Sequence, residues 1–200
     1  MKARTVVKAK WDDYAIPKRE FAFANGRERL RELICYISAR CKDDPTFAKT
    51  KLYKILYFSD FLYYAYFGKP ITGVPYVRLP RGPVPKPIRR MMAEMDGDDI
   101  TIEKRPFHGY VQHKIVPARE AKIDELFKPR HISMVDSVIQ VLWGKTATEV
   151  SDMSHTRAWR IAKKNGMIPY QAIFISDEPV NDYDISRARE LSRKYGWAIE

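Results

Sequence analysis

Hydrophobic side chains recur every three or four residues over several stretches of the chain, which is the spacing of amphipathic α-helices. The first stretch predicts a helix from residue 26 to about residue 41, whose apolar face is formed by Leu30, Leu33, Ile34, Ile37 and Cys41. Another predicted helix begins near residue 130, with an apolar face formed by Ile132, Val135, Val138, Ile139 and Leu142. Thr146 and Glu149 have the spacing of a capping box, and a charged helix is expected over 185–195. The pattern indicates a mainly helical protein.

One predicted helix is hydrophobic on almost every side. Asp44 followed by Pro45 predicts its start, as a capping carboxylate with proline in the first helical position, and Gly68 predicts its end. A helix without a polar face must be buried among other elements. Asp60 lies on this helix among tyrosines, and a buried, unpaired charge is costly. Asp60 is therefore predicted to be paired with tyrosine hydroxyls, backbone amides or His155.

Prolines and glycines concentrate between residues 70 and 87. They predict a short strand or extended segment at 76–79 and a stiff turn at Gly82-Pro83-Val84-Pro85. A third helix is expected over about 86–95, and a β-hairpin over 101–116 with its turn at 106–109. The expected fold class is mainly α within α+β: a compact helical domain with a buried central helix and a small antiparallel β-hairpin or sheet.

The first 25 residues carry no sustained hydrophobic period and are expected to form an N-terminal arm, followed by a single domain over 26–200. The apolar stretch at 52–67 is interrupted by polar residues and is shorter than the roughly 20 apolar residues of a membrane span. The N-terminal residues lack the apolar run of a signal peptide. Cys35 and Cys41 fall on different faces of one predicted helix, and free thiols fit the cytoplasm. We expect a cytoplasmic protein with no membrane partner.

The net charge of +11 is unevenly distributed. No acid interrupts residues 61–93, whose basic members are Lys69, Arg78, Arg81, Lys86, Arg89 and Arg90. Such a basic stripe attracts an acidic protein or a nucleic acid, and it is also typical of an ordinary solvated surface. Near the C-terminus the sign reverses, in a stretch without Lys or Arg that contains Asp177, Glu178, Asp182 and Asp184. The protein is therefore expected to be electrically polarised.

Residue types that catalyse reactions or bind metals are present, but their spacing is unsuitable. Ser154 and His155 are adjacent on a predicted helix, so their side chains diverge by about 100° and the serine cannot pass its proton to this histidine. An odd separation puts His108 and His113 on opposite faces of a strand. The prolines of residues 82–85 remove the N–H donors that a phosphate loop needs. We predict no catalytic residue, metal or cofactor.

Three segments together resemble the Panacea domain of SocA-like antitoxins. They are residues 50–60 with a lysine, a leucine, an aromatic pair and an aspartate, residues 68–85 ending in Gly82-Pro83-Val84-Pro85, and residues 151–155 followed by Trp159. Their order is that of the family, and the resemblance spans about residues 30–175. It implies a small, mostly helical domain that neutralises a toxin encoded beside it, usually by direct protein contact. A family member also resembles an adaptor that delivers its toxin to a protease.

The candidate partner-binding residues come from these segments and from the basic stripe. They are Asp60, Tyr76, Arg81, Pro83, Pro85, Arg89, His155 and Trp159. His155 and Trp159 are four residues apart and share a helix face. They either fill the core or, together with Asp60 and Tyr76, shape a groove in which a toxin segment docks.

The leading hypothesis is an antitoxin without enzymatic activity, which neutralises a cognate toxin by binding it or by acting as an adaptor for its proteolysis. The alternative is a nucleic-acid-binding regulator, which only the basic charge supports, because the aromatic residues concentrate in a helix predicted to be buried. DNA binding is expected to be weak. A hydrolase that uses Asp60 and His155 is a remote alternative, since no nucleophile, metal or cofactor loop accompanies them.

Overall fold

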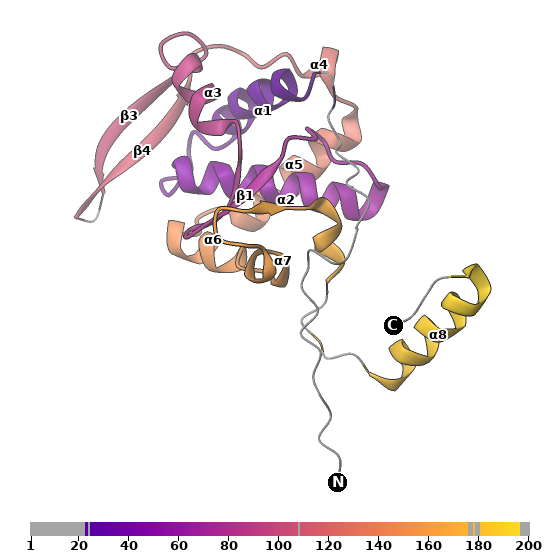
Figure 1. The fold of residues 1–200 in the computed structure, drawn as a ribbon. Coiled ribbons are helices and arrows are strands. Elements are labelled where there is room, and N and C mark those ends of the chain that lie inside the picture. Colours follow the sequence, from indigo (N-terminus) through magenta and orange to yellow (C-terminus); the bar gives the residue numbers. More distant parts are fainter. Residues whose placement is uncertain (1–22, 24, 108, 176–177, 179–180, 197–200) are drawn as a thin grey trace.

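The structure is a computed structural model that describes residues 23, 25–107, 109–175, 178 and 181–196 (Figure 1). In chain order its elements are α1 (Gly26–Arg40), α2 (Lys49–Phe67), β1 (Tyr76–Leu79), β2 (Gly82–Pro85), α3 (Ile88–Met95), β3 (Ile100–Phe107), β4 (Tyr110–Pro117), α4 (Ile123–Leu126), α5 (Pro129–Leu142), α6 (Ala147–Met153), α7 (Arg157–Ile161), β5 (Met167–Ile168), the 3₁₀ helix η1 (Tyr170–Phe174) and α8 (Asp182–Tyr195). The expected fold class, mainly helical with small antiparallel sheets, is confirmed. The predicted N-terminal arm falls almost entirely outside the described residues, and the single domain over 26–200 stays a prediction.

Helix α2 is the centre of the fold. Figure 1 shows it crossing the middle of the molecule, and it contacts α1, α5, α6, β2 and η1. Side chains from different sides of the helix, including Leu52, Ile55 and Phe61, are completely buried. Each such side chain stabilises the fold by roughly 1.5–3 kcal/mol relative to exposure. The predicted buried central helix is confirmed.

The predicted start of this helix is wrong, whereas its predicted end is correct. Helix α2 begins at Lys49, and Ala48 at its N-cap provides no side-chain hydrogen bond. Asp44 is buried and accepts hydrogen bonds from the Lys51 ammonium at 2.6 Å and the Thr46 amide at 2.9 Å. A buried carboxylate needs a charged or hydrogen-bonding partner, and Lys51 and Thr46 supply it. At the other end, Gly68 adopts the left-handed conformation, with φ of 69°.

Asp60 joins α2 to the segment that precedes β1. Its carboxylate accepts hydrogen bonds from the Thr72 amide at 2.7 Å, the Thr72 hydroxyl at 2.5 Å and the Tyr76 hydroxyl at 2.8 Å. Burial raises the pKa of Asp60, and these donors act against that shift. The predicted burial and pairing with a tyrosine hydroxyl and a backbone amide are confirmed. His155 does not belong to this cluster; its ring stacks on Trp159.

The prolines at 83 and 85 lie in a strand, not in the stiff turn that we predicted for 82–85. Strand β2 pairs antiparallel with β1, and the strand order is β2-β1-β5, so β2 is an edge. The Lys86 amide donates to the Pro75 carbonyl, and alternation along the strand then directs the nitrogens of Pro83 and Pro85 away from β1. Proline is compatible with an edge strand because no ladder bond is lost there.

Strands β3 and β4 form the predicted hairpin, which projects from the helical body in Figure 1. Its strands are longer than predicted, because Pro106 and Phe107, which we placed in the turn, pair with Val111 and Tyr110. Its base is fixed by a partly buried ion network. The Arg119 guanidinium, just beyond β4, donates to Glu32 of α1 at 2.6 Å and to Asp99 at 2.5 Å. Burial acts to raise the pKa of Glu32, but Arg119 outweighs it and the pKa lies below its usual value. The network fixes the hairpin on α1.

The two helices predicted near the C-terminus are also observed, although the last one begins at Asp182 and not at Ile185. Thr146 and Glu149 form the predicted capping box at the start of α6. Helix α8 confirms the predicted charged terminal helix, and Asn181 caps it through the Asp184 amide. In Figure 1 this helix lies apart from the other elements, and none of its residues is buried.

Replacing Asp60 with alanine is predicted to lower the free energy of unfolding by about 1–3 kcal/mol, because the Thr72 and Tyr76 donors are left unsatisfied in the core. Asp60→Asn retains one carbonyl oxygen of the same shape and should cost less. Urea denaturation of both variants measures the difference. A change of less than about 0.5 kcal/mol in Asp60→Ala would contradict the role assigned to this carboxylate.

Candidate functional site

A groove of about 510 Å³ opens beside the start of α2. Four parts of the chain form its walls: residues 46–54 around the start of α2, the β1–β2 turn, the outer part of the β3–β4 hairpin, and the first residues of α6. Such a volume is typical of sites that hold a small molecule or a short segment of a partner. We therefore treat this groove as the candidate binding site.

Asp44 holds these walls in place. It binds Lys51 of α2, and its second contact, with the Gly144 amide at 3.4 Å, fixes the turn before α6. The hairpin is attached to the same loop, because the Gln112 side chain donates to the Pro45 carbonyl at 3.1 Å and Lys114 donates to the Lys42 carbonyl at 2.9 Å. Burial acts to raise the pKa of Asp44, but Lys51 and Thr46 outweigh it and the pKa is lowered.

The groove is positively charged. Its lining includes Lys49, Lys54, Arg81 and His113, and none of the described residues that line it is an aspartate or glutamate. The helix dipole adds to this charge, because α2 starts here without a capping side chain or an acid in its first turn. Low-dielectric walls of one charge sign concentrate the electrostatic potential in a cleft. The site is therefore suited to an anionic group.

Lys54 forms part of the groove floor. Its side chain is buried, and its ammonium donates to the Pro83 carbonyl at 3.0 Å. Burial lowers the pKa of Lys54 to about 7, so its charge responds to pH near neutrality. Gly82 is required at this position, because φ is 93° and a Cβ atom would overlap the Ser154 hydroxyl and the Lys54 ammonium.

Only one of the predicted site residues, Arg81, lines the groove. Asp60 and Tyr76 are 1% and 0% exposed, so they offer no surface to a partner in this structure. Pro83 and Pro85 are also buried, and Pro83 contributes through its carbonyl. Arg89 is exposed on α3, near enough to Tyr53 for its charge to act on that phenol.

His155 and Trp159 form a separate stack at the end of β1. Their ring centroids are 3.9 Å apart. The Arg78 guanidinium also lies over the Trp159 ring, with its central carbon 4.4 Å from the ring centroid. The Trp159 indole N–H donates to the Leu79 carbonyl at 3.0 Å. The stack therefore fixes the strand that leads into the β1–β2 turn. Of the two alternatives for these rings, a groove shared with Asp60 and Tyr76 is not observed, because the carboxylate and the phenol lie in the core.

The geometry gives little support to a hydrolase built on Asp60 and His155, since the two residues belong to different clusters. The Ser154 hydroxyl donates to the Ser151 carbonyl at 2.6 Å. Among the described residues, no group of three or more His, Cys, Asp or Glu side chains is arranged to hold a metal ion. His113 lies on β4, while His108 falls outside the described residues.

Sequence reasoning missed Lys49, Lys54 and the hairpin wall as site residues. The sequence did contain one indication of these residues. Lys51 and Lys54 lie within a helix predicted to be buried, and a buried ammonium requires a partner. No local pattern could show that the hairpin, some 60 residues further along, would cover the start of the same helix.

The described residues thus form a mainly helical fold with a groove whose lining contains no described aspartate or glutamate. A family model described as "Antitoxin SocA-like, Panacea domain" matches residues 52–160, more than half of the chain. The chain belongs to this family, which implies a toxin–antitoxin role and suggests a non-enzymatic one. No curated protein and no solved structure matches it. Within the described residues, no helix is long and apolar enough to cross a membrane.

Lys54→Met is predicted to change how stability depends on pH. The pKa of Lys54 is about 7 in the folded chain and about 10.4 in an unfolded one, so the unfolded chain binds more protons between these values. The free energy of unfolding of the wild type should therefore rise relative to the variant as pH increases from about 7 towards 10. Urea denaturation at several pH values measures this trend, with exposed Lys69→Met as the control. Equal pH trends in both variants would contradict the buried state of Lys54.

Proposed function

We propose that this chain neutralises a cognate protein toxin by direct contact and without enzymatic action. The observation that carries the proposal is the acid-free groove, which adds a preformed binding surface to the family membership. Its walls come from segments held together by buried ion pairs and hydrogen bonds, so little conformational entropy is lost on binding. Preorganisation of this kind favours the capture of a partner.

Direct contact is the step that blocking and delivery to a protease have in common. An adaptor must bind its toxin before a protease can degrade it, and a blocking antitoxin needs only this first contact. We therefore propose binding as the primary activity, with a protease as an additional partner if the adaptor route is used. The buried, free thiols of Cys35 and Cys41 fit action in the cytoplasm.

Co-expression tests this function. The product of the neighbouring gene, expressed alone in its host, should arrest growth, and this chain should restore it because the complex hides the toxic surface. The two proteins should co-purify, or the toxin should be degraded faster. A harmless neighbour, or rescue with neither a complex nor faster turnover, would refute direct neutralisation and return the enzyme hypothesis to the front, with Asp60 and His155 as its first residues to mutate.

The basic surface makes a nucleic-acid-binding regulator the second candidate. We predict only weak DNA binding, in the range of about 10⁻⁴ to 10⁻⁶ M at physiological salt, because non-specific phosphate contacts give affinities of this order. A gel-shift titration with random and promoter DNA measures it. Nanomolar, sequence-selective binding would place the regulator first.

A further inference from the structure

The cations that line the groove are not neutralised by acids of the described chain. Lys49 starts α2 and Arg81 lies in the β1–β2 turn, and neither forms an ion pair with a described residue. Elsewhere on the surface arginines have acidic neighbours, as in the pairs Arg27–Glu94 and Arg40–Asp136. The groove therefore concentrates positive charge that a partner can neutralise.

The same groove has an apolar wall. Leu79 and Val84 line it from β1 and β2, and Phe107 and Val111 line it from the hairpin. Val111 is 59% exposed, so its aliphatic side chain is accessible to a partner. Covering this surface gives a favourable free energy that a phosphate backbone, having no apolar groups of matching shape, cannot obtain. The combination of cations and aliphatic side chains matches a polypeptide.

We propose that the groove binds an extended, acidic segment of the toxin that carries an aliphatic or aromatic side chain between its carboxylates. The carboxylates meet Lys49, Arg81 and the start of α2, while the apolar side chain packs against Val84 and Val111. This inference rests on the proposed function and assigns a surface and a partner chemistry to it. The volume of about 510 Å³ fits a short segment rather than a whole protein face.

Charge reversal of single residues tests the groove. Lys49→Glu and Arg81→Glu should each raise the Kd for the purified product of the neighbouring gene by about tenfold or more, because like charges then oppose each other across the interface. Lys49→Glu puts an acid in the first turn of α2, where the helix dipole favours it, so loss of folding does not explain loss of binding.

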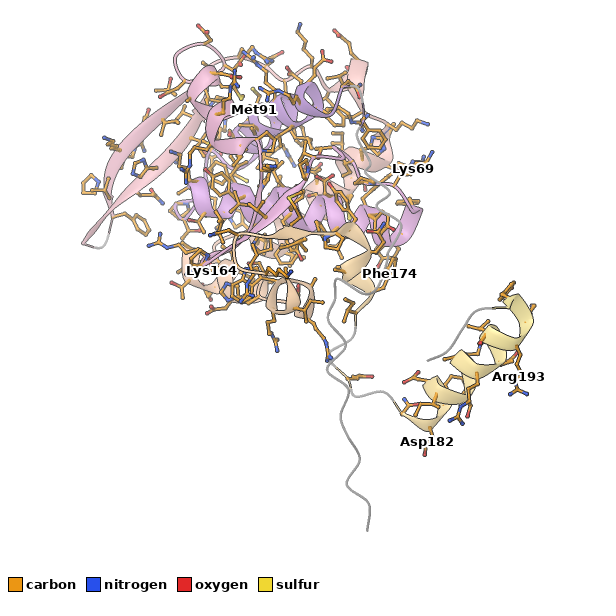
Figure 2. All side chains as sticks on the ribbon, viewed as in Figure 1. Lys69, Met91, Lys164, Phe174, Asp182 and Arg193 are labelled. Carbon is orange, nitrogen blue, oxygen red and sulfur yellow. The ribbon has the colours of Figure 1, made fainter. Side chains whose placement is uncertain are left out.

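Lys69→Glu is the matched control. This exposed lysine, labelled in Figure 2, follows the opposite end of α2 and carries the same charge change away from the groove. The Kd of the Lys69→Glu variant for the product of the neighbouring gene should stay within about twofold of the wild-type value, since a charge far from an interface is screened at physiological salt. Isothermal titration calorimetry provides the affinities, and thermal melts check the fold. Equal weakening by all three variants would overturn the groove and indicate a diffuse charge effect.

The outcomes separate this inference from the proposed function. If the toxin is neutralised and binds Lys49→Glu and Arg81→Glu as tightly as the wild type, the groove assignment is wrong while the antitoxin function stands. If the neighbouring product is harmless, the function fails, and the groove is tested with a fluorescein-labelled, glutamate-rich peptide that has a central phenylalanine. The groove chemistry is supported if the wild type binds this peptide and the Lys49→Glu variant does not. No binding, or tighter binding of a single-stranded oligonucleotide of equal charge, overturns it.

Discussion

The burial of charged groups on α2 is the constraint on which the rest of the structure depends. A helix enclosed on almost all sides leaves its charged side chains without water, and the three that are buried find partners in neighbouring elements. Asp60 binds Thr72 and Tyr76, Lys51 binds Asp44, and Lys54 binds the Pro83 carbonyl. Each contact fixes one element against the helix. The positions of the loop before α2, of β1 and of β2 follow from these three contacts.

Periodicity predicted the elements whose structure depends on local sequence. The apolar faces of α1 and α5, the 101–116 hairpin and the capping box at Thr146 were all confirmed. The errors concern residues whose role depends on distant contacts. Asp44 had the pattern of a helix cap, but it pairs with Lys51, and residues 82–85 had the pattern of a turn, but an edge strand also tolerates their prolines. Neither the pairing of Asp44 nor the strand at 82–85 can be predicted from neighbouring residues in the sequence.

The segments that resemble the antitoxin family act mainly as scaffold. Asp60 and Tyr76 stabilise the core, while Trp159 holds the end of β1 through the Leu79 carbonyl. The groove wall also uses side chains that these segments do not contain, such as those of the hairpin. The core and the groove are thus specified largely by different parts of one chain. This separation explains why motif reasoning located the fold better than the site.

The positive charge of the groove depends on which acidic and basic side chains lie near it. Glu32, Asp44, Asp60 and Asp99 are all at most 5% exposed and serve as acceptors inside the molecule. Three of them pair with Arg31, Lys51 and Arg119, so these contacts use as many cations as carboxylates, and the excess of basic residues comes from the composition of the chain. At the start of α2 this excess coincides with the positive end of a helix dipole and with aliphatic surface. The groove is therefore positive because unpaired cations and the start of a helix lie together there, with no described acid in its lining.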